Sequence, residues 1–314
     1  MAESLAEQAV NAINDVSGVH PGHRSAHAKG VLLTATFTPT AEAAGLTTAA
    51  HMQGEPVRAT VRFSNGGGNP EIPDYAREGR GMAVKFYLPD GSTTDIVALT
   101  IPCFFARTPE DFLEFTRLRK PDPETGQPNM EKLGAWLGEH PEAQQSVQAA
   151  VGASPPDSYA TAAYNSIHSF RWIDSAGDGR WLRYRFVPEE GESSISDEEA
   201  RERGRHYLAE DIVERSGAAF KLLVVLAEDG DPIDDPTAAW PEERQKVEVG
   251  RLELGGEDTE REQGDDVLVF DPTRVTDGIE LSDDPILRFR PRAYAVSVER
   301  RSGAPIPAAL ATSD

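Results

Sequence analysis

The chain of 314 residues has a single cysteine, Cys103, so no disulfide can form within it. That fits a reducing compartment, and we predict a cytoplasmic location. Cys103 stands in an apolar run that ends at Phe105, which is typical of a buried core thiol. The first seven residues lack the basic start and apolar stretch of a secretory signal, in keeping with this prediction.

Long apolar runs and an excess of basic residues are missing as well. No run reaches the roughly eighteen apolar residues of a membrane span, so no transmembrane helix is expected. There are 31 Lys and Arg against 53 Asp and Glu, a formal net charge of −22. Such a surface repels nucleic acid and anionic lipid, so neither is an expected partner. Because the acidic residues are spread over 189–202, 228–235 and 253–266, we interpret them as solvated surface and infer no metal site.

The apolar pattern predicts strands with helices between and around them. Seven segments rich in β-branched and aromatic residues, separated by turn residues, are predicted strands: 31–37, 57–63, 82–88, 166–173, 180–187, 220–226 and 247–254. Helical spacing covers 1–16, 108–119, 130–151 with a break near Pro141, 196–216, and 284–301, where Pro291 is a complication. The predicted fold is α+β, an antiparallel β-barrel surrounded by helices. We expect one domain over 1–314, with a leading helix at 1–15 and a flexible tail at 302–314.

His27 stands shortly before the first predicted strand, in the segment 24–30, RSAHAKG. A lone histidine beside a strand is usually a core residue. With His20 and His23 it could also form part of a zinc site, but no fourth ligand stands at a closing spacing. The glycine run 66–68 could be a phosphate loop, although no Lys-Ser or Lys-Thr pair follows it.

Several motifs together resemble the catalase superfamily, specifically its short catalase-related peroxidases. They are RSAHAKG at 24–30, RFS at 62–64, RGMAVKFY at 80–87, FDPTRVTDGIE at 270–280, and an arginine four residues before a tyrosine at 290–294. The resemblance runs from about residue 16 to 301. It implies a catalase-like barrel that binds haem b.

The resemblance also implies roles for individual residues. Tyr294 would be the iron ligand as a tyrosinate, and Arg290, one helical turn earlier, would lower its pKa. His27 would move a proton between the two peroxide oxygens, and Ser64 would hold its ring by a hydrogen bond. The remaining cofactor contacts would come from three arginines at the haem propionates and one aromatic ring packed on the haem: Arg24, Arg62, Arg301 and Phe112.

The segment around Leu99 departs from the catalase pattern. Catalases have an Asn-Asn pair where this chain has Leu99 and Thr100, and one of those amides holds the second peroxide. Leucine cannot donate a hydrogen bond, so peroxide reduction by another donor is favoured over efficient disproportionation. The chain also lacks the regions that full-length catalases use for nicotinamide-nucleotide binding and tight tetramers. We therefore expect a monomer or homodimer without that nucleotide.

The leading hypothesis is a cytoplasmic haem peroxidase that uses hydrogen peroxide or organic hydroperoxides and a small-molecule electron donor, with weak catalase activity. One alternative is a fatty-acid hydroperoxide isomerase similar to the allene oxide synthases of this fold, which the apolar Leu99 would suit. A second alternative is a haem-binding module without enzymatic activity.

Overall fold

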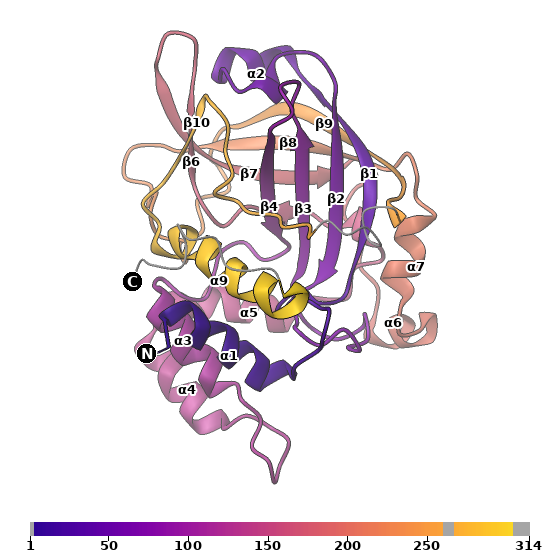
Figure 1. Cartoon of the computed structure of the whole chain (residues 1–314), viewed down its shortest axis with the longest axis vertical. Coiled ribbons are helices and arrows are strands. Elements are labelled where there is room, and N and C mark those ends of the chain that lie inside the picture. Colours follow the sequence, from indigo (N-terminus) through magenta and orange to yellow (C-terminus); the bar gives the residue numbers. More distant parts are fainter. Residues whose placement is uncertain (1–2, 260–266, 304–314) are drawn as a thin grey trace.

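Eight strands close into an antiparallel barrel in the computed structural model, which describes residues 3–259 and 267–303 (Figure 1). The ring runs β1-β2-β3-β4-β5-β7-β8-β9 and returns to β1, and β6 and β10 extend it beside β7. The strands are β1 (Gly30–Pro39), β2 (Val57–Asn65), β3 (Arg80–Tyr87), β4 (Thr93–Leu99), β5 (Tyr164–Asn165), β6 (Phe170–Ile173), β7 (Gly179–Pro188), β8 (Ala219–Leu226), β9 (Lys246–Glu257) and β10 (Ile279–Leu281). The predicted barrel is confirmed.

Alternation along the strands decides which side chains fill the barrel. In β1, Leu33, Ala35 and Phe37 point into the main core, while Thr34 and Thr36 between them are exposed. Since the side-chain period of a strand is two, paired residues on neighbouring strands share a face. The interior is packed with apolar side chains, as expected of an eight-stranded barrel. A ligand of the barrel therefore has to bind outside it, and the outward-facing residues of β1–β4 are called the outer wall below.

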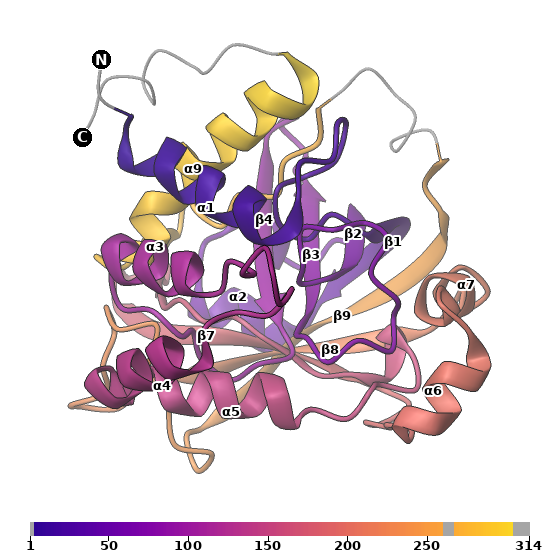
Figure 2. The same cartoon turned by 90° about the horizontal axis from the view of Figure 1, so that it is seen from below.

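Helices surround the barrel in groups. They are α1 (Leu5–Ser17), α2 (Ala41–Leu46), α3 (Pro109–Leu118), α4 (Met130–Glu139), α5 (Gln144–Gly152), α6 (Asp197–Arg203), α7 (Tyr207–Val213) and α9 (Pro285–Ser302), with short 3-10 turns η1 (Ala50–Met52), η2 (Pro141–Ala143) and η3 (Tyr159–Thr161). Figure 2 shows α3, α4 and α5 on one side of the barrel and α6 and α7 on the other. Helix α9 crosses one end of the outer wall beside α1 (Figure 1).

Several predicted elements differ in detail. The helix expected over 196–216 is broken, because Gly204 ends α6 with a positive φ of 106° before α7 begins. Of the strand expected over 166–173, only 170–173 forms one, β6, and the short β5 lies before the expected range. Pro291 lies inside α9 without ending it. The break near Pro141 is confirmed, and the predicted flexible tail falls largely on residues 304–314, outside the described residues.

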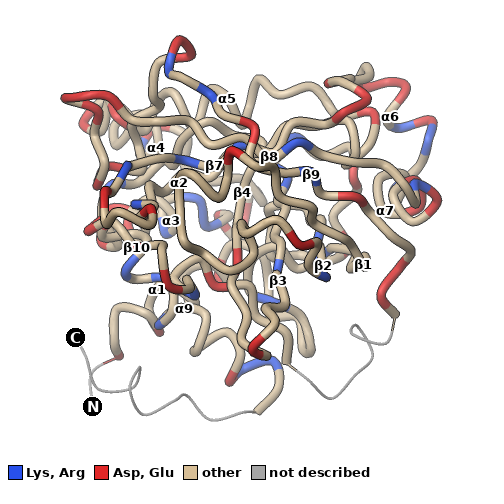
Figure 3. Tube along the Cα trace, turned by 90° about the horizontal axis from the view of Figure 1, so that it is seen from above, with Lys and Arg blue, Asp and Glu red and all other residues tan. Residues whose placement is uncertain are grey.

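The surface is acidic on several sides. Figure 3 shows Asp and Glu distributed over many loops and around α6 and α7 rather than in one patch. In the part of the chain that the structure describes, every helix is too short or too polar to cross a membrane.

Candidate active site

One row of paired residues across the outer wall underlies the candidate site. Gly30 of β1 pairs with Ser64 of β2, Ser64 with Gly81 of β3, Gly81 with Leu99 of β4, and Leu99 with Asn165 of β5. Because paired residues share a face, Ser64 and Leu99 lie on the same side of the wall with Gly81 between them. Two of the predicted site residues are thus brought together by strand register.

His27 lies over this row in a strained backbone conformation. Its φ of 54° makes it the one non-glycine residue with positive φ within 3–259 and 267–303, a conformation that costs free energy and needs support from its surroundings. The support comes from the glycine run, since the amides of His27 and Ala28 donate to the carbonyls of Gly66 and Gly67 at 3.2 and 3.0 Å. The glycine run therefore holds the histidine segment. The ring nitrogen Nδ1 is 3.0 Å from the Ser64 hydroxyl, so the predicted contact is present.

The surroundings of His27 keep its imidazole neutral. Burial first, and then the positive charges of Arg62, Arg290 and Arg24, together lower the pKa of His27 to about 3. Yet the side chain is only half-buried. A neutral imidazole that keeps accessible surface can accept a proton from a bound molecule.

Helix α9 supplies the opposite side of the site. Arg290, Tyr294, Ser297 and Arg301 are spaced by four, three and four residues, so they share one face of the helix. Burial raises the pKa of Tyr294, while the charge of Arg290 and a hydrogen bond from its guanidinium lower it. The predicted effect of Arg290 on Tyr294 is thus present in direction, although burial outweighs it. Since Arg290 also lowers the pKa of His27, one guanidinium acts on both residues.

The other predicted arginines lie around the same space. The guanidinium nitrogens of Arg24 and Arg301 donate to the same backbone oxygen, that of Leu268, at 2.8 and 3.1 Å. Arg62 is buried on the outer wall, two residues before Ser64 on β2 and on the same face. It donates to the carbonyl of Ala28 at 3.3 Å. The two segments that carry Arg24 and Arg301, far apart in the sequence, therefore lie close together.

Phe112 is half-buried on α3 and belongs to an aromatic cluster. Its ring stacks on Phe104 at 6.1 Å and on Phe105 at 5.6 Å between centroids. Those phenylalanines follow the Leu99 strand closely in the chain. A haem contact for Phe112 stays a prediction.

A buried pair that the motif analysis did not single out lies at the start of α9. Nδ1 of His168 is 2.6 Å from Oδ2 of Asp284, and the other oxygen of Asp284 caps the helix by accepting from the amides of Ile286 and Leu287 at 2.8 and 3.1 Å. Burial lowers the pKa of His168 to about 4, and Arg290 acts in the same direction, whereas Asp284 raises it. The helix-capping pattern of an aspartate followed by proline was the available sequence signal for Asp284.

Gly81 is a further residue that sequence reasoning missed, because no site residue was assigned within its motif at 80–87. A Cβ at this position would lie 2.8 Å from the Ser64 hydroxyl and 2.9 Å from Nδ1 and Cε1 of His27. Contacts that short do not occur, so any side chain at position 81 displaces the histidine or the serine.

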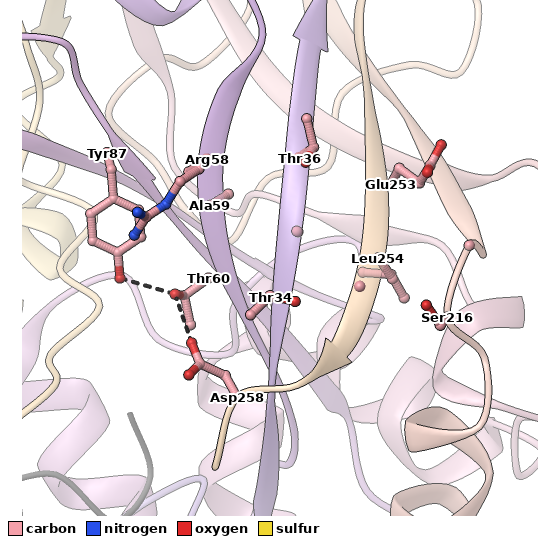
Figure 4. Close-up of a pocket in the computed structure, with 13 residues that line it drawn as sticks. Thr34, Thr36, Arg58, Ala59, Thr60, Tyr87, Ser216, Glu253, Leu254 and Asp258 are labelled. Atoms are coloured by element: carbon pink, nitrogen blue, oxygen red, sulfur yellow. Dashed lines mark hydrogen bonds between the residues drawn. The ribbon is translucent and has the colours of Figure 1, made fainter. Parts of the chain in front are cut away.

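A larger hollow of about 760 Å³ lies farther along the outer wall (Figure 4). Thr34, Thr60, Tyr87 and Asp258 line it, and the Thr60 hydroxyl bonds with the Tyr87 hydroxyl at 2.9 Å and with the Asp258 carboxylate at 3.3 Å. It contains none of the predicted site residues. In the described ranges no group of three or more His, Cys, Asp or Glu side chains could hold a metal ion, so the zinc alternative for His20, His23 and His27 gains no support.

Comparison with known proteins bears on this arrangement. The sequence model of the catalase family matches residues 18–307. A catalase-related peroxidase of Mycolicibacterium paratuberculosis is 43% identical over 301 residues, which cover 95% of each chain. The chain belongs to the catalase family. A catalase-related peroxidase of Synechococcus elongatus is 34% identical over 94% of this chain and 88% of its own length.

This catalase-family chain is shorter than the catalases that it matches. The catalase of Latilactobacillus sakei is 28% identical over 90% of this chain but only 62% of its own length. Among solved structures, catalase A from Saccharomyces cerevisiae superposes with a TM-score of 0.79 at 23% identity, over 89% of this chain and 61% of that one, which supports the fold. The chain therefore spans about three-fifths of these catalases.

Membership of the catalase family implies haem, and the residues present fit such a group. The site offers a phenol with an adjacent guanidinium on one side, a neutral imidazole on the other, and three further arginines for carboxylates: Arg24, Arg62 and Arg301. His27 at the outer wall and Arg290 and Tyr294 on α9 all keep accessible surface. A flat anionic cofactor with an iron centre suits this donor set.

Proposed function

We propose that the chain is a haem b peroxidase that reduces hydrogen peroxide or organic hydroperoxides at the expense of a small electron donor, with weak catalase activity. The observation that carries the proposal is His27, a neutral imidazole fixed by Ser64 over an outer-wall row in which the apolar Leu99 is paired with Gly81. The relatives named catalase-related peroxidase support the same function.

The residues that would hold the cofactor divide into two sets. Tyr294 would bind the iron as a phenolate, a form that the adjacent Arg290 favours against the effect of burial. Arg24, Arg62 and Arg301 would pair with the two propionates, since guanidinium and carboxylate match in a two-pronged geometry. When bound, haem supplies the redox-active iron at which the peroxide is reduced.

His27 performs the proton transfers. Its pKa of about 3 leaves it neutral at physiological pH, so it can take the proton from one peroxide oxygen. It then delivers that proton to the other oxygen, so that water or an alcohol leaves in place of hydroxide or alkoxide. Ser64 limits rotation of the ring, and Gly81 leaves room for it. Such acid–base assistance is worth about 10²–10⁴ in rate.

Leu99 accounts for the proposed preference for peroxide reduction by a separate donor over disproportionation of hydrogen peroxide. Its side chain lies beside Gly81 on the outer wall and is 8% exposed. An apolar side chain offers no hydrogen bond to hold a second hydrogen peroxide for oxidation. A peroxidase needs no such bond, because a separate donor supplies the electrons.

The proposal also covers the setting of the enzyme. We place it in the cytoplasm as a monomer or homodimer. The presence of a single cysteine, which excludes a disulfide within the chain, supports the cytoplasmic location. Cys103 is buried, and burial raises its thiol pKa to about 11. The isomerase and haem-module alternatives find no support in the relatives named above.

The visible absorption spectrum of protein produced with sufficient haem is the first test. We expect a high-spin ferric spectrum whose Soret band falls on addition of peracetic acid in the wild type. In His27→Gln the fall should be slower by about 10²–10⁴ with haem still bound. In Tyr294→Phe the ferric spectrum should change. A protein that stays colourless when haem is offered, or a Tyr294→Phe spectrum identical to wild type, would contradict the assignment.

A further inference from the structure

A second hollow, of about 400 Å³, lies at the outer edge of the candidate site. It is formed by α1, by the segment 18–25 and by the last turns of α9. Its volume lies in the range of sites for small molecules. Ser25, one of its lining residues, donates its amide to the Ser297 hydroxyl of α9 at 3.3 Å, and this contact fixes one wall of the hollow two residues from His27.

The hollow is positively charged in a strongly acidic chain. Three arginines and two histidines line it, and no Asp or Glu does: Arg24, Arg300, Arg301, His20 and His23. The whole chain has 53 acidic against 31 basic residues. Acidic residues lie close by without lining the hollow: the Glu3 carboxylate accepts from the side-chain amide of Asn11 at 3.2 Å, and Arg300, after the hydrogen bonds from Ser4, helps to lower the pKa of Glu7. A concave positive site in an otherwise repelling surface attracts small anions and excludes large acidic ones.

The inner and outer parts of the hollow serve different purposes. Arg24 and Arg301, which form the inner part, are half-buried, both contact the backbone oxygen of Leu268, and belong to the predicted cofactor set. Arg300, His20 and His23 form the outer part and have no place in that set. Asn11 and Asn14 lie three residues apart on the same face of α1, where their amides can donate hydrogen bonds to a bound molecule.

We propose that this hollow binds the electron donor, and that the donor is a small organic anion with an oxidisable hydroxyl group. The inference rests on the proposed peroxidase function. Two donor molecules each give up one electron and one proton, and the peroxide takes up both electrons and both protons. The O–O bond then breaks to give one alcohol, or water, and one water. The exposed Arg300 would contact the acidic group of the donor, so that the hydroxyl group points toward the cofactor edge at Arg24 and Arg301.

Two donors that differ only in charge provide the test: 4-hydroxyphenylacetate, an anion, and 4-hydroxyphenylacetamide, its neutral isostere. With the haem-loaded enzyme and peroxide, Arg300→Glu should lower kcat/KM for the anion by about tenfold or more and leave the amide unchanged, as expected when an attractive charge becomes a repulsive one. Arg58→Glu is the matched control, because it makes the same charge change at an exposed position of the other hollow. The Arg58→Glu control should change kcat/KM for the anion and for the amide by the same factor.

Equilibrium binding of 4-hydroxyphenylacetate without peroxide, followed by titration calorimetry, gives a second readout. Arg300→Glu should weaken this binding by about tenfold, and Arg58→Glu should not. Equal effects of Arg300→Glu on both donors, or binding that is insensitive to Arg300, would overturn the donor site while leaving the peroxidase function standing. Failure of the wild type to oxidise either phenol would instead contradict the peroxidase function, and the binding measurement would still decide the anion site.

Discussion

The ring nitrogen Nδ1 of His27 lies 3.0 Å from the hydroxyl oxygen of Ser64, and the two residues belong to different segments that meet where β1 begins and β2 ends. This contact fixes the ring of a residue whose backbone adopts a positive φ, which few non-glycine residues do. Replacing Ser64 by Ala should therefore lower kcat/KM for peroxide by about 10- to 100-fold, the usual range for a partner that orients a functional histidine.

Circular dichroism and haem content serve as controls for Ser64→Ala, and both should match wild type. Ser64→Thr retains the hydroxyl and should recover part of the activity. An unchanged kcat/KM in Ser64→Ala would mean that the glycine-run contacts alone orient His27.

Gly81→Ala should disable the site without unfolding the barrel. The added methyl group would lie 2.9 Å from the His27 ring and 2.8 Å from the Ser64 hydroxyl, so one of them has to move. We expect a loss of peroxide turnover of about 10²-fold or more, because proton transfer depends on the position of the imidazole. Gly79→Ala is the matched control, since its Cβ would meet Ile101 at an ordinary 3.6 Å. Similar activity in the two variants would refute the crowding argument.

Leu99→Asn should raise oxygen release from hydrogen peroxide. The new amide would stand beside Gly81 on the outer wall, next to His27, where it can donate a hydrogen bond to a second peroxide. An oxygen electrode without an added donor measures the effect, and we expect an increase of about tenfold, the value of a single hydrogen bond of ordinary strength. Leu99→Ala removes the apolar bulk without adding a donor and should not show the increase.

His51→Phe should make stability less dependent on pH. His51 lies in the barrel core with its ring 4.9 Å from that of Phe86, and burial lowers its pKa to about 3 from an ordinary value near 6.5. Between these values the unfolded chain binds a proton that the folded chain does not, so the free energy of unfolding falls as the pH falls through this window. One such group contributes about 1.4 kcal/mol per pH unit.

Urea unfolding at several pH values from 4 to 6 tests the His51 prediction. Removal of the imidazole should reduce the slope of the unfolding free energy against pH by the contribution of about one proton. His27 and His168 act in the same direction, with pKa values lowered to about 3 and about 4, so part of the slope should remain. An identical slope in wild type and variant would show that His51 does not titrate on unfolding.

The sequence alone determined the chemistry-bearing residue types and most of the strands. The β-branched and aromatic residues of 31–37 were sufficient to predict most of β1, because strand preference depends on residues close together in the chain. The spacing of Arg290, Tyr294 and Arg301 placed them on one helix face for the same reason. The break between α6 and α7, by contrast, depends on the backbone conformation of Gly204, which the charged helical pattern around it concealed.

Only the tertiary structure decided how these residues act on one another. The pKa of His27 depends on burial and on three guanidiniums from separate segments, and no sequence pattern contains those distances. Likewise, the need for glycine at position 81 follows from a ring that another segment places above it, and the pairing of His168 with Asp284 joins the barrel to α9. Local patterns follow from bonds along the chain, whereas electrostatics and close approach depend on which segments meet in space.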